Sequence, residues 1–215
     1  DGNGVTSGHV RVYKNVTNVW TQIGSDINGE SVGDGSGWSV SLSADGSTVA
    51  IGAFFNDGNG TDSGHVRVYK NIADVWTQIG DDIDGEAVGD ESGYSVSLST
   101  NGSVIAIGAY RNDGSASNSG HVRVYQNVVG VWTQIGSDIN GEAANDNSGW
   151  SVSLSADGST VAIGALSNDE NGTDSGHVRV YDLSSVLSLN SFIQSNFSVY
   201  PNPTSERLTI DLENN

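Results

Sequence analysis

A repeat of 56 residues is the feature that most restricts the fold of this 215-residue chain. Trp38, Tyr94 and Trp150 occupy the same place in three successive copies. The copies read GWSVSLSADGSTVAIGA at 37–53, GYSVSLSTNGSVIAIGA at 93–109 and GWSVSLSADGSTVAIGA at 149–165. A repeat of this length and regularity predicts an array of similar supersecondary units.

Each unit contains a hairpin. Residues 38–43 and 48–53 alternate between larger apolar and smaller side chains, the period of a strand. The pair between them is Asp-Gly at 45–46 and 157–158 and Asn-Gly at 101–102, which is a strong signal for a tight turn. One face of the hairpin is bulky and apolar, and the other consists of Ser, Ala and Gly. We therefore expect the small face of one unit to pack against the bulky face of its neighbour.

Two further strands complete the unit. SGHVRVY begins at Ser7, Ser63, Ser119 and Ser175, and VWTQIG begins at Val19, Val75 and Val131. The unit then has strands A (38–43), B (48–53), C (64–69) and D (75–80). Four short antiparallel strands per repeat predict a propeller blade.

We therefore expect an all-β fold, a β-propeller fragment of four-stranded antiparallel blades with 56-residue repeats and a short C-terminal β tail. The predicted parts are a half blade at 1–24, blades at about 36–80 and 92–136, and a partial blade at 148–181. Closed propellers have about four to eight blades. We expect the chain, which has no methionine even at position 1, to be a fragment or processed piece of a larger ring.

Residues 1–181 resemble the FG-GAP repeat of integrin-α-type β-propellers. The resemblance rests on SG-aromatic-SVSLS, the Asp-Gly turn, VAIGA and GHVRVY. It implies a role in adhesion or recognition outside the cell. Calcium-binding family members often use an A–B loop rich in Asp and Asn. Here that loop is only the short turn at 45–46, 101–102 and 157–158, so the family's usual metal site does not carry over.

The C-terminal segment has a different character. We expect a linker at 182–196, with a final edge strand as an open alternative, and then a truncated domain at 197–215. Pro201 and Pro203 fix an extended turn before a strand at 207–212. The motif Tyr200-Pro201-Asn202-Pro203 resembles the start of the C-terminal sorting domain of type IX secretion. That resemblance implies contact with the type IX machinery, export across the outer membrane, and release or surface attachment.

Composition excludes several classes. A net charge of −18 argues against nucleic acid as a partner and favours cations, basic partners or simple solubility. With no cysteine there is no disulfide and no thiolate metal site. No apolar run of the sequence is long enough to cross a bilayer.

The sequence offers no support for an enzyme. The histidines at 9, 65, 121 and 177 occupy one blade position, each two residues before an arginine, which favours structural pairing with neighbouring blades. The tryptophans at 20, 76 and 132 are interpreted as packing residues rather than a sugar-stacking platform. No G-x-S-x-G elbow accompanies a plausible Asp and His set.

In an up-and-down blade the B–C and D–A loops share one rim, and these loops carry most of the 26 acidic residues. Alternating oxygen ligands are typical of calcium loops, so calcium is a candidate ligand; hydrogen bonds that cap the loops are the alternative. The candidate metal ligands are Asp26, Asn28, Glu30, Asp82, Asp84, Glu86, Asp138, Asn140 and Glu142 in D–A loops, and Asp57, Asn59, Asp62, Asp169, Asn171 and Asp174 in B–C loops.

The copies differ most just after the shared Gly-Ala. The variable positions are Phe54, Phe55, Tyr110, Arg111, Leu166 and Ser167. A scaffold that keeps its strands and varies its loop tips is typical of a binding module, whereas neutral drift is the alternative. If these are exposed ligand contacts, replacing Phe54 and Tyr110 by Ala weakens binding and leaves the melting temperature nearly unchanged.

These observations favour a secreted or cell-surface, non-enzymatic propeller module that recognises a protein or glycan at its acidic rim. Two alternatives remain open: an accessory propeller domain of a larger secreted hydrolase, and a structural component of a surface layer.

Overall fold

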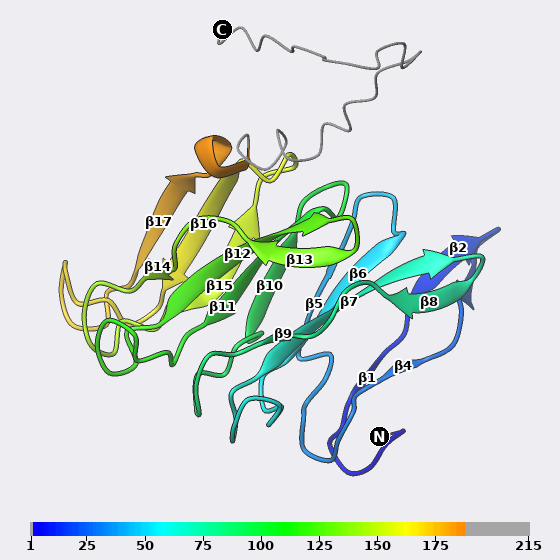
Figure 1. Ribbon diagram of the computed structural model, residues 1–215, viewed down its shortest axis with the longest axis horizontal. Coiled ribbons are helices and arrows are strands. Elements are labelled where there is room, and N and C mark those ends of the chain that lie inside the picture. Colours follow the sequence, from blue (N-terminus) through cyan, green and yellow to red (C-terminus); the bar gives the residue numbers. More distant parts are fainter. Residues whose placement is uncertain (1, 188–215) are drawn as a thin grey trace, which may run out of the picture.

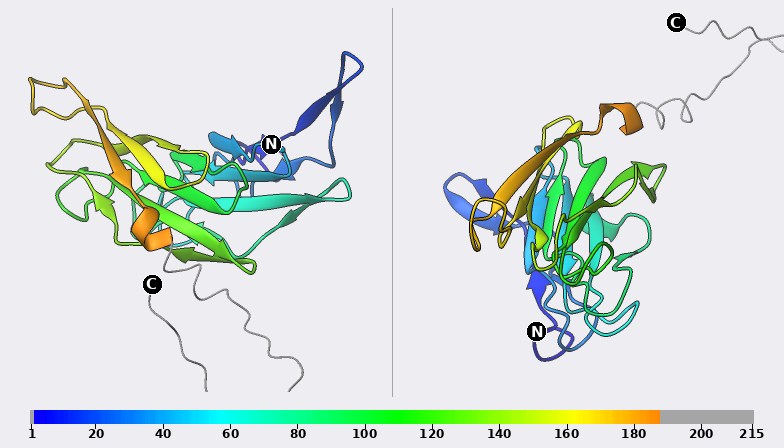
Figure 2. Two further views of the ribbon diagram at one scale, coloured as in Figure 1. Left: turned by 90° about the horizontal axis from the view of Figure 1, so that it is seen from above. Right: turned by 90° about the vertical axis from the view of Figure 1, so that its left-hand side faces the viewer.

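The structure is a computed structural model that describes residues 2–187. The predicted domain at 197–215 and its motif at 200–203 lie outside the described residues, as does the linker from 188 onward. Three sheets stand side by side like an open fan, with a smaller N-terminal unit at one end (Figures 1 and 2). Within the described residues the fan does not close into a ring. The all-β propeller fragment predicted from the repeat is confirmed.

The chain order of the strands follows the repeat. The N-terminal unit contains β1 (His9–Val10), β2 (Tyr13–Val16), β3 (Val19–Gln22) and β4 (Ile27–Asn28). The first complete sheet contains β5 (Ser39–Leu42), β6 (Thr48–Ala53), β7 (His65–Ile72), β8 (Val75–Gln78) and β9 (Ile83–Asp84). The second contains β10 (Ser95–Leu98), β11 (Val104–Ala109), β12 (His121–Val128), β13 (Val131–Gln134) and β14 (Ile139–Asn140). The last contains β15 (Ser148–Leu154), β16 (Thr160–Ala165) and β17 (His177–Asp182).

Each complete sheet is antiparallel, with the order β5-β6-β7-β8 or β10-β11-β12-β13. The outer strand differs from the prediction, because it is split into two pieces. β8 pairs with the second half of β7, and β9 pairs with its first two residues, so that His65 lies opposite Asp84. The Ile79 amide still donates to the Val68 carbonyl at 2.8 Å, and residues 80–82 then leave the sheet, whereas a continuous strand over 75–80 was expected. This interruption brings Asp82 beside β7.

Two kinds of turn connect the strands. In the A–B turns only the glycine of each Asp-Gly or Asn-Gly pair has a positive φ, for example 69° at Gly46. The C–D turns are two-residue loops in which both residues have positive φ: 50° and 65° at Ala73 and Asp74, and 51° and 84° at Val129 and Gly130. This is the type I′ geometry that suits the twist of a hairpin.

The cores lie between successive sheets, in spaces that we call blade junctions. Junction 1 separates the N-terminal unit from β5–β9, junction 2 separates β5–β9 from β10–β14, and junction 3 separates β10–β14 from β15–β17. In junction 2, Val66 and Val68 pack against Ile105 and Ile107 of the next sheet, and all four are fully buried. Ala50, on the small face of β6, is buried in the same cluster as Leu98, Ile105 and Ile107, so the predicted packing of a small face on a bulky face is confirmed.

Serine and glycine allow this close approach. Ser39 Oγ donates to the carbonyl of Gly93 at 2.7 Å, and Ser41 Oγ accepts from the Leu98 amide at 3.0 Å. A Cβ added to Gly52 would collide with the Gly93 carbonyl. The neighbouring sheet thus requires glycine at this strand position.

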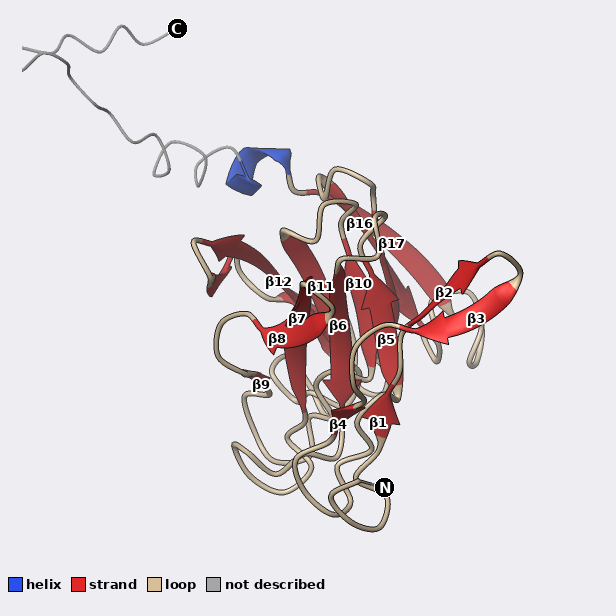
Figure 3. Cartoon of the chain, turned by 90° about the vertical axis from the view of Figure 1, so that its right-hand side faces the viewer, coloured by secondary structure: helices blue, strands red, loops and turns tan. Residues whose placement is uncertain are grey.

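The B–C and D–A loops gather at one end of the molecule, as expected for this topology (Figures 1 and 3). We call this end the acidic rim. Buried pairs join its two kinds of loop, with the amide Nδ2 of Asn56 3.2 Å from Asp34 Oδ2 and that of Asn112 2.9 Å from Asp90 Oδ2. The rim loops are consequently tied to each other within and between blades.

The described chain ends in a helical turn at 184–187. Leu183 is buried in the core of junction 3, and Val186 and Leu187 pack against that core. The packed region thus extends beyond the predicted start of the linker at 182. Within residues 2–187, no helix has the length and apolar character needed to cross a membrane.

Candidate functional site

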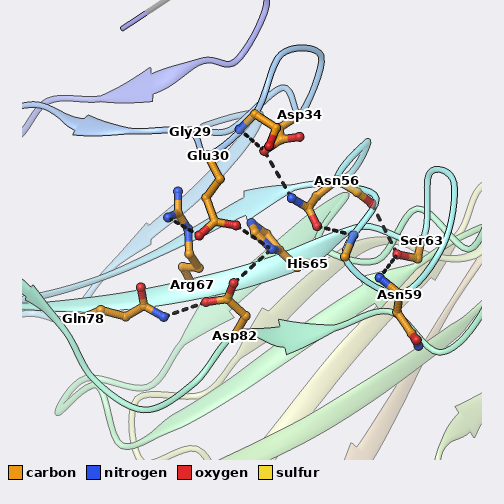
Figure 4. Close-up of polar contacts among 12 residues, drawn as sticks. Gly29, Glu30, Asp34, Asn56, Asn59, Ser63, His65, Arg67, Gln78 and Asp82 are labelled. Atoms are coloured by element: carbon orange, nitrogen blue, oxygen red, sulfur yellow. Dashed lines mark hydrogen bonds and ion pairs between the residues drawn. The ribbon is translucent and has the colours of Figure 1, made fainter. Parts of the chain in front are cut away.

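A cluster of three titratable side chains lies in junction 1, at the acidic rim (Figure 4). His65 is the first residue of β7, Glu30 follows β4 in the preceding unit, and Asp82 precedes β9. His65 Nδ1 is 3.5 Å from Asp82 Oδ2 and 4.0 Å from Glu30 Oε2. The fold therefore brings together carboxylates that are 52 positions apart in the sequence.

The second oxygen of each carboxylate has its own partner. Arg67 Nη1 is 3.2 Å from Glu30 Oε1, and Gln78 Nε2 donates to Asp82 Oδ1 at 2.6 Å. These contacts orient the remaining oxygens, Oε2 and Oδ2, toward the histidine. Arg67 also donates to the backbone carbonyl of Asn28 at 2.8 Å, which fixes its guanidinium across the junction.

His65 is almost completely buried, with only 1% of its side chain exposed. Its Nε2 atom has no hydrogen-bond partner within residues 2–187, and its Nδ1 atom has only the two carboxylate contacts given above. Burial lowers the pKa of His65, although the carboxylate of Asp82 opposes that change. Burial likewise lowers the pKa of the equivalent His121 to about 4, and Arg123 contributes in the same direction. Both imidazoles are therefore neutral near pH 7.

Junction 2 repeats the cluster. His121 Nδ1 is 3.8 Å from Glu86 Oε2, and Asp138 completes the group. Gln134 Nε2 donates to Asp138 Oδ1 at 2.7 Å, and Arg123 Nη1 lies 3.7 Å from Glu86 Oε1. The same set of side chains thus recurs, with Glu86 rather than the aspartate as the carboxylate nearest to His121 Nδ1.

The two outer copies differ from the complete ones. In junction 3, His177 faces Glu142 at 3.6 Å and the more exposed Glu170 at 3.8 Å. In the N-terminal unit, both oxygens of Asp26 are engaged within the described residues. Gln22 donates to Oδ1 at 2.7 Å, and Arg11 Nε donates to Oδ2 at 3.1 Å.

The D–A triplets proposed as calcium ligands do not converge. Asp82 lies in junction 1, whereas Glu86, four residues later, lies in junction 2. Between them, Asp84 lies in β9, and its backbone carbonyl accepts from Arg123 at 2.6 Å. Asn28 and Asn140 have the same role towards Arg67 and Arg179. The triplets are divided because the chain crosses from one junction to the next within five residues.

The B–C candidates make hydrogen bonds within the rim loops. Asp57 Oδ1 accepts from the Asp62 amide at 2.9 Å, and Asp169 Oδ1 accepts from the Asp174 amide at 2.7 Å. Asn59 Nδ2 donates to the carbonyl of Gly85 in the adjacent D–A loop at 2.8 Å. These contacts are the loop-capping bonds considered as the alternative to calcium.

Two of the variable positions are not exposed loop tips. Phe54 and Tyr110 are only 6% and 8% exposed. They belong to an aromatic row with Trp38, Tyr94 and Trp150, in which successive ring centroids are 4.3 to 5.6 Å apart. The expectation of exposure was wrong for these two, because the aromatic residue of the next blade covers each of them.

The other variable positions reach the surface. Phe55, Arg111 and Leu166 are exposed, and Ser167 is half-buried. Arg111 Nη1 is 2.9 Å from the buried carboxylate of Glu91. Burial raises the pKa of Tyr110 to about 12, and a hydrogen bond with Glu91 adds to the effect. Tyr110 and Arg111 thus both interact with the buried carboxylate of Glu91, at the base of the loop that follows β11.

Sequence reasoning missed the buried Asp–Asn pairs. Asp34, Asp90 and Asp146 were counted among rim charges, but each is buried and accepts from an asparagine of a B–C loop. The asparagines recur at 56, 112 and 168, so their spacing was the available signal. The sequence also predicted that Arg67 and Arg123 pair across junctions, which they do. It did not predict that two carboxylates converge on the histidines at 65, 121 and 177.

Comparison with known proteins identifies related sequences and folds. The FG-GAP repeat family matches residues 28–69, 83–125 and 140–181. No curated protein matches the sequence. Among solved structures, the periplasmic gluconolactonase of Pseudomonas aeruginosa is 18% identical, with a TM-score of 0.49, over 83% of this chain and 48% of that one.

Two other solved structures are similar over smaller shares of their own length. A protein described as a 6-phosphogluconolactonase from Bacteroides uniformis is 19% identical, with a TM-score of 0.40, over 63% of this chain and 38% of that one. The tricorn protease is 13% identical, with a TM-score of 0.39, over 68% of this chain and 12% of that one. The chain thus spans less than half the length of each of these structures.

Proposed function

Because the chain belongs to the FG-GAP repeat family, we propose that it is a secreted or cell-surface recognition module without enzymatic activity. Its ligand, a protein or a glycan, binds at the acidic rim. The observation that carries this proposal is the rim itself: the B–C and D–A loops of several blades lie at one end of the array of sheets, and these loops carry most of the acidic residues. A strongly negative surface favours ligands that are basic or carry bound cations.

The rim is well suited to recognition because its loops are anchored while their tips differ. Asp90 and Asn112 tie the loop bases together beneath the surface. Above them, Phe55 and Arg111 present an aromatic and a cationic side chain at the same position of two successive blades. A fixed scaffold with different exposed tips lowers the conformational cost of binding and permits selectivity among ligands.

Binding of the full 215-residue chain to arrays of glycans and extracellular proteins tests the proposal. Phe55→Ala should weaken binding to the ligand that the array identifies. Val129→Ser is the matched control, because this exposed residue lies in a C–D turn at the opposite end of the blade. Equal binding by all variants, or equal loss with the control, would refute recognition at the rim.

Export by type IX secretion is a second part of the proposal and rests on the motif at 200–203. Deletion of residues 197–215 in the native host should retain the protein inside the cell envelope. Unchanged export of the shortened chain would contradict this assignment. A catalytic domain in the same reading frame would instead favour the role of an accessory domain.

A further inference from the structure

The clusters in junctions 1 and 2 have the features of metal centres, independently of the proposed recognition function. We propose that the glutamate, histidine and aspartate of each cluster bind one divalent ion of the first transition series, such as Zn²⁺. The ligand sets are Glu30, His65 and Asp82 in junction 1, and Glu86, His121 and Asp138 in junction 2.

The distances suit such an ion. In each cluster the candidate ligand atoms, one per residue, lie within 4.8 Å of one another. Bonds from zinc to histidine nitrogen or carboxylate oxygen are about 2.0–2.2 Å, which places ligand atoms of one ion roughly 3–4 Å apart. His65 Nδ1 is already 3.5 Å from Asp82 Oδ2 and 4.0 Å from Glu30 Oε2. Only small side-chain movements are therefore needed.

The surroundings of the ligands are those of an oriented site. Arg67 and Gln78 hold the oxygens that face away from the histidine (Figure 4). Partners of this kind orient metal ligands and strengthen binding. The same two residue types hold Glu86 and Asp138 in junction 2. Because the two junctions are built from copies of one repeated sequence, the arrangement in junction 1 predicts a second site of the same kind in junction 2.

The buried histidine is a second, separate indication. Burying a polar group without a hydrogen bond is unfavourable, yet Nε2 of His65 has no partner within residues 2–187, and Nδ1 has only the long contacts to Asp82 and Glu30. It borders a cavity of about 400 Å³, whose wall also includes Glu30, Asp57, Asp82 and Asp84. The cavity supplies a path for an ion, and its carboxylates attract cations. A metal at Nδ1 would lie between the two carboxylate oxygens that already face this atom at 3.5 and 4.0 Å.

The donor atoms select the class of ion. Calcium takes six to eight oxygen ligands, whereas imidazole nitrogen combined with carboxylate oxygen suits zinc and its first-row neighbours. The inference therefore differs from the calcium loops considered from sequence, both in the residues that converge and in the kind of ion.

The chain contains its own control. Asp26 is equivalent to Asp82, but Arg11 and Gln22 engage both of its oxygens, and the described residues place no glutamate of a preceding unit beside His9. We expect no site there. In junction 3, Glu170 replaces the aspartate and is 71% exposed, so we expect weaker binding. The 215-residue chain should therefore bind two ions more tightly than any others.

Titration of the metal-free 215-residue chain with ZnCl₂ in a calorimeter is the direct test. We expect two sites in the wild type and the loss of both in the double variant Glu30→Gln, Glu86→Gln. Both glutamates are partly exposed, so the variant is expected to fold, which circular dichroism verifies. Asp26→Asn should leave zinc binding unchanged. Gln78→Leu should weaken one of the two sites by about 10- to 100-fold.

Two further measurements make the test decisive. Co²⁺ should give visible absorption bands indicating a nitrogen ligand, and these bands should disappear in the double variant His65→Gln, His121→Gln. The proposal is overturned if the glutamine-for-glutamate double variant binds zinc as the wild type does, or if Asp26→Asn removes as much binding. Displacement of zinc by an equal concentration of calcium would also overturn it, because that result indicates a site made of oxygen ligands alone.

Discussion

Phe54 and Leu166 occupy the same repeat position but should respond very differently to truncation. Phe54 is 6% exposed and lies between Trp38, at 4.7 Å between ring centroids, and Tyr94, at 5.6 Å. Leu166 is 52% exposed in the last blade. Truncating a buried Phe to Ala costs about 3–5 kcal/mol. Since Trp38 is itself exposed at the edge of the row, we expect Phe54→Ala to fall near 3 kcal/mol.

This destabilisation should lower the melting temperature by roughly 6–12 °C, because 1 kcal/mol corresponds to about 2–4 °C in a chain of this size. Leu166→Ala, the matched control, should change the free energy of unfolding by less than about 1 kcal/mol, since half of its side chain already contacts water. Urea titrations monitored by circular dichroism measure both values. Equal effects of the two substitutions, or no effect of Phe54→Ala, would refute the argument that the next blade covers this position.

Three further predictions concern local contacts. Val129→Asn should increase the free energy of unfolding, measured by urea titration, by about 1 kcal/mol. The reason is that a β-branched residue is strained at a φ of 51°, whereas Asn-Gly suits this type I′ turn. A loss of stability would contradict the assignment of a type I′ turn. Trp132→Phe should cost about 1–3 kcal/mol, because the indole donates to the Ile79 carbonyl at 2.8 Å across junction 2. Trp20→Phe, at an exposed position, should cost under about 0.5 kcal/mol, and similar costs for the two would argue against the cross-junction bond. Hydrogen bonds from the Ser43 hydroxyl and the Ser47 amide lower the pKa of Asp45 from 3.8 to about 2. Its contribution to stability is therefore complete above pH 3.8 and is lost as the pH falls through about 2, and carbonyl NMR should show the pKa rising in Ser43→Ala; an unchanged pKa would exclude that bond as the cause.

The clusters of histidine and carboxylate side chains in junctions 1 and 2 could not be predicted from the sequence. The alternation of acidic residues along residues 26–30 resembled a local calcium loop, because a linear motif reveals only neighbours in the chain. In the structure, Glu30 instead faces His65 of the next unit. The repeat carried the information that every unit has the same residues, but it contained no signal for which unit supplies each ligand.

The sequence by itself determined the strands, their order and the stacking of small faces on bulky faces. These properties depend on side-chain alternation and on turn residues, which act within a few positions; strand B, predicted at 48–53, coincides with β6. Only the tertiary structure decided that the D strand is interrupted and that Phe54 is covered while Leu166 is exposed. It also decided which carboxylates meet each histidine. Those outcomes depend on contacts between residues of different blades. Two equivalent repeat positions therefore differ in exposure when the blade that follows covers the first but not the second.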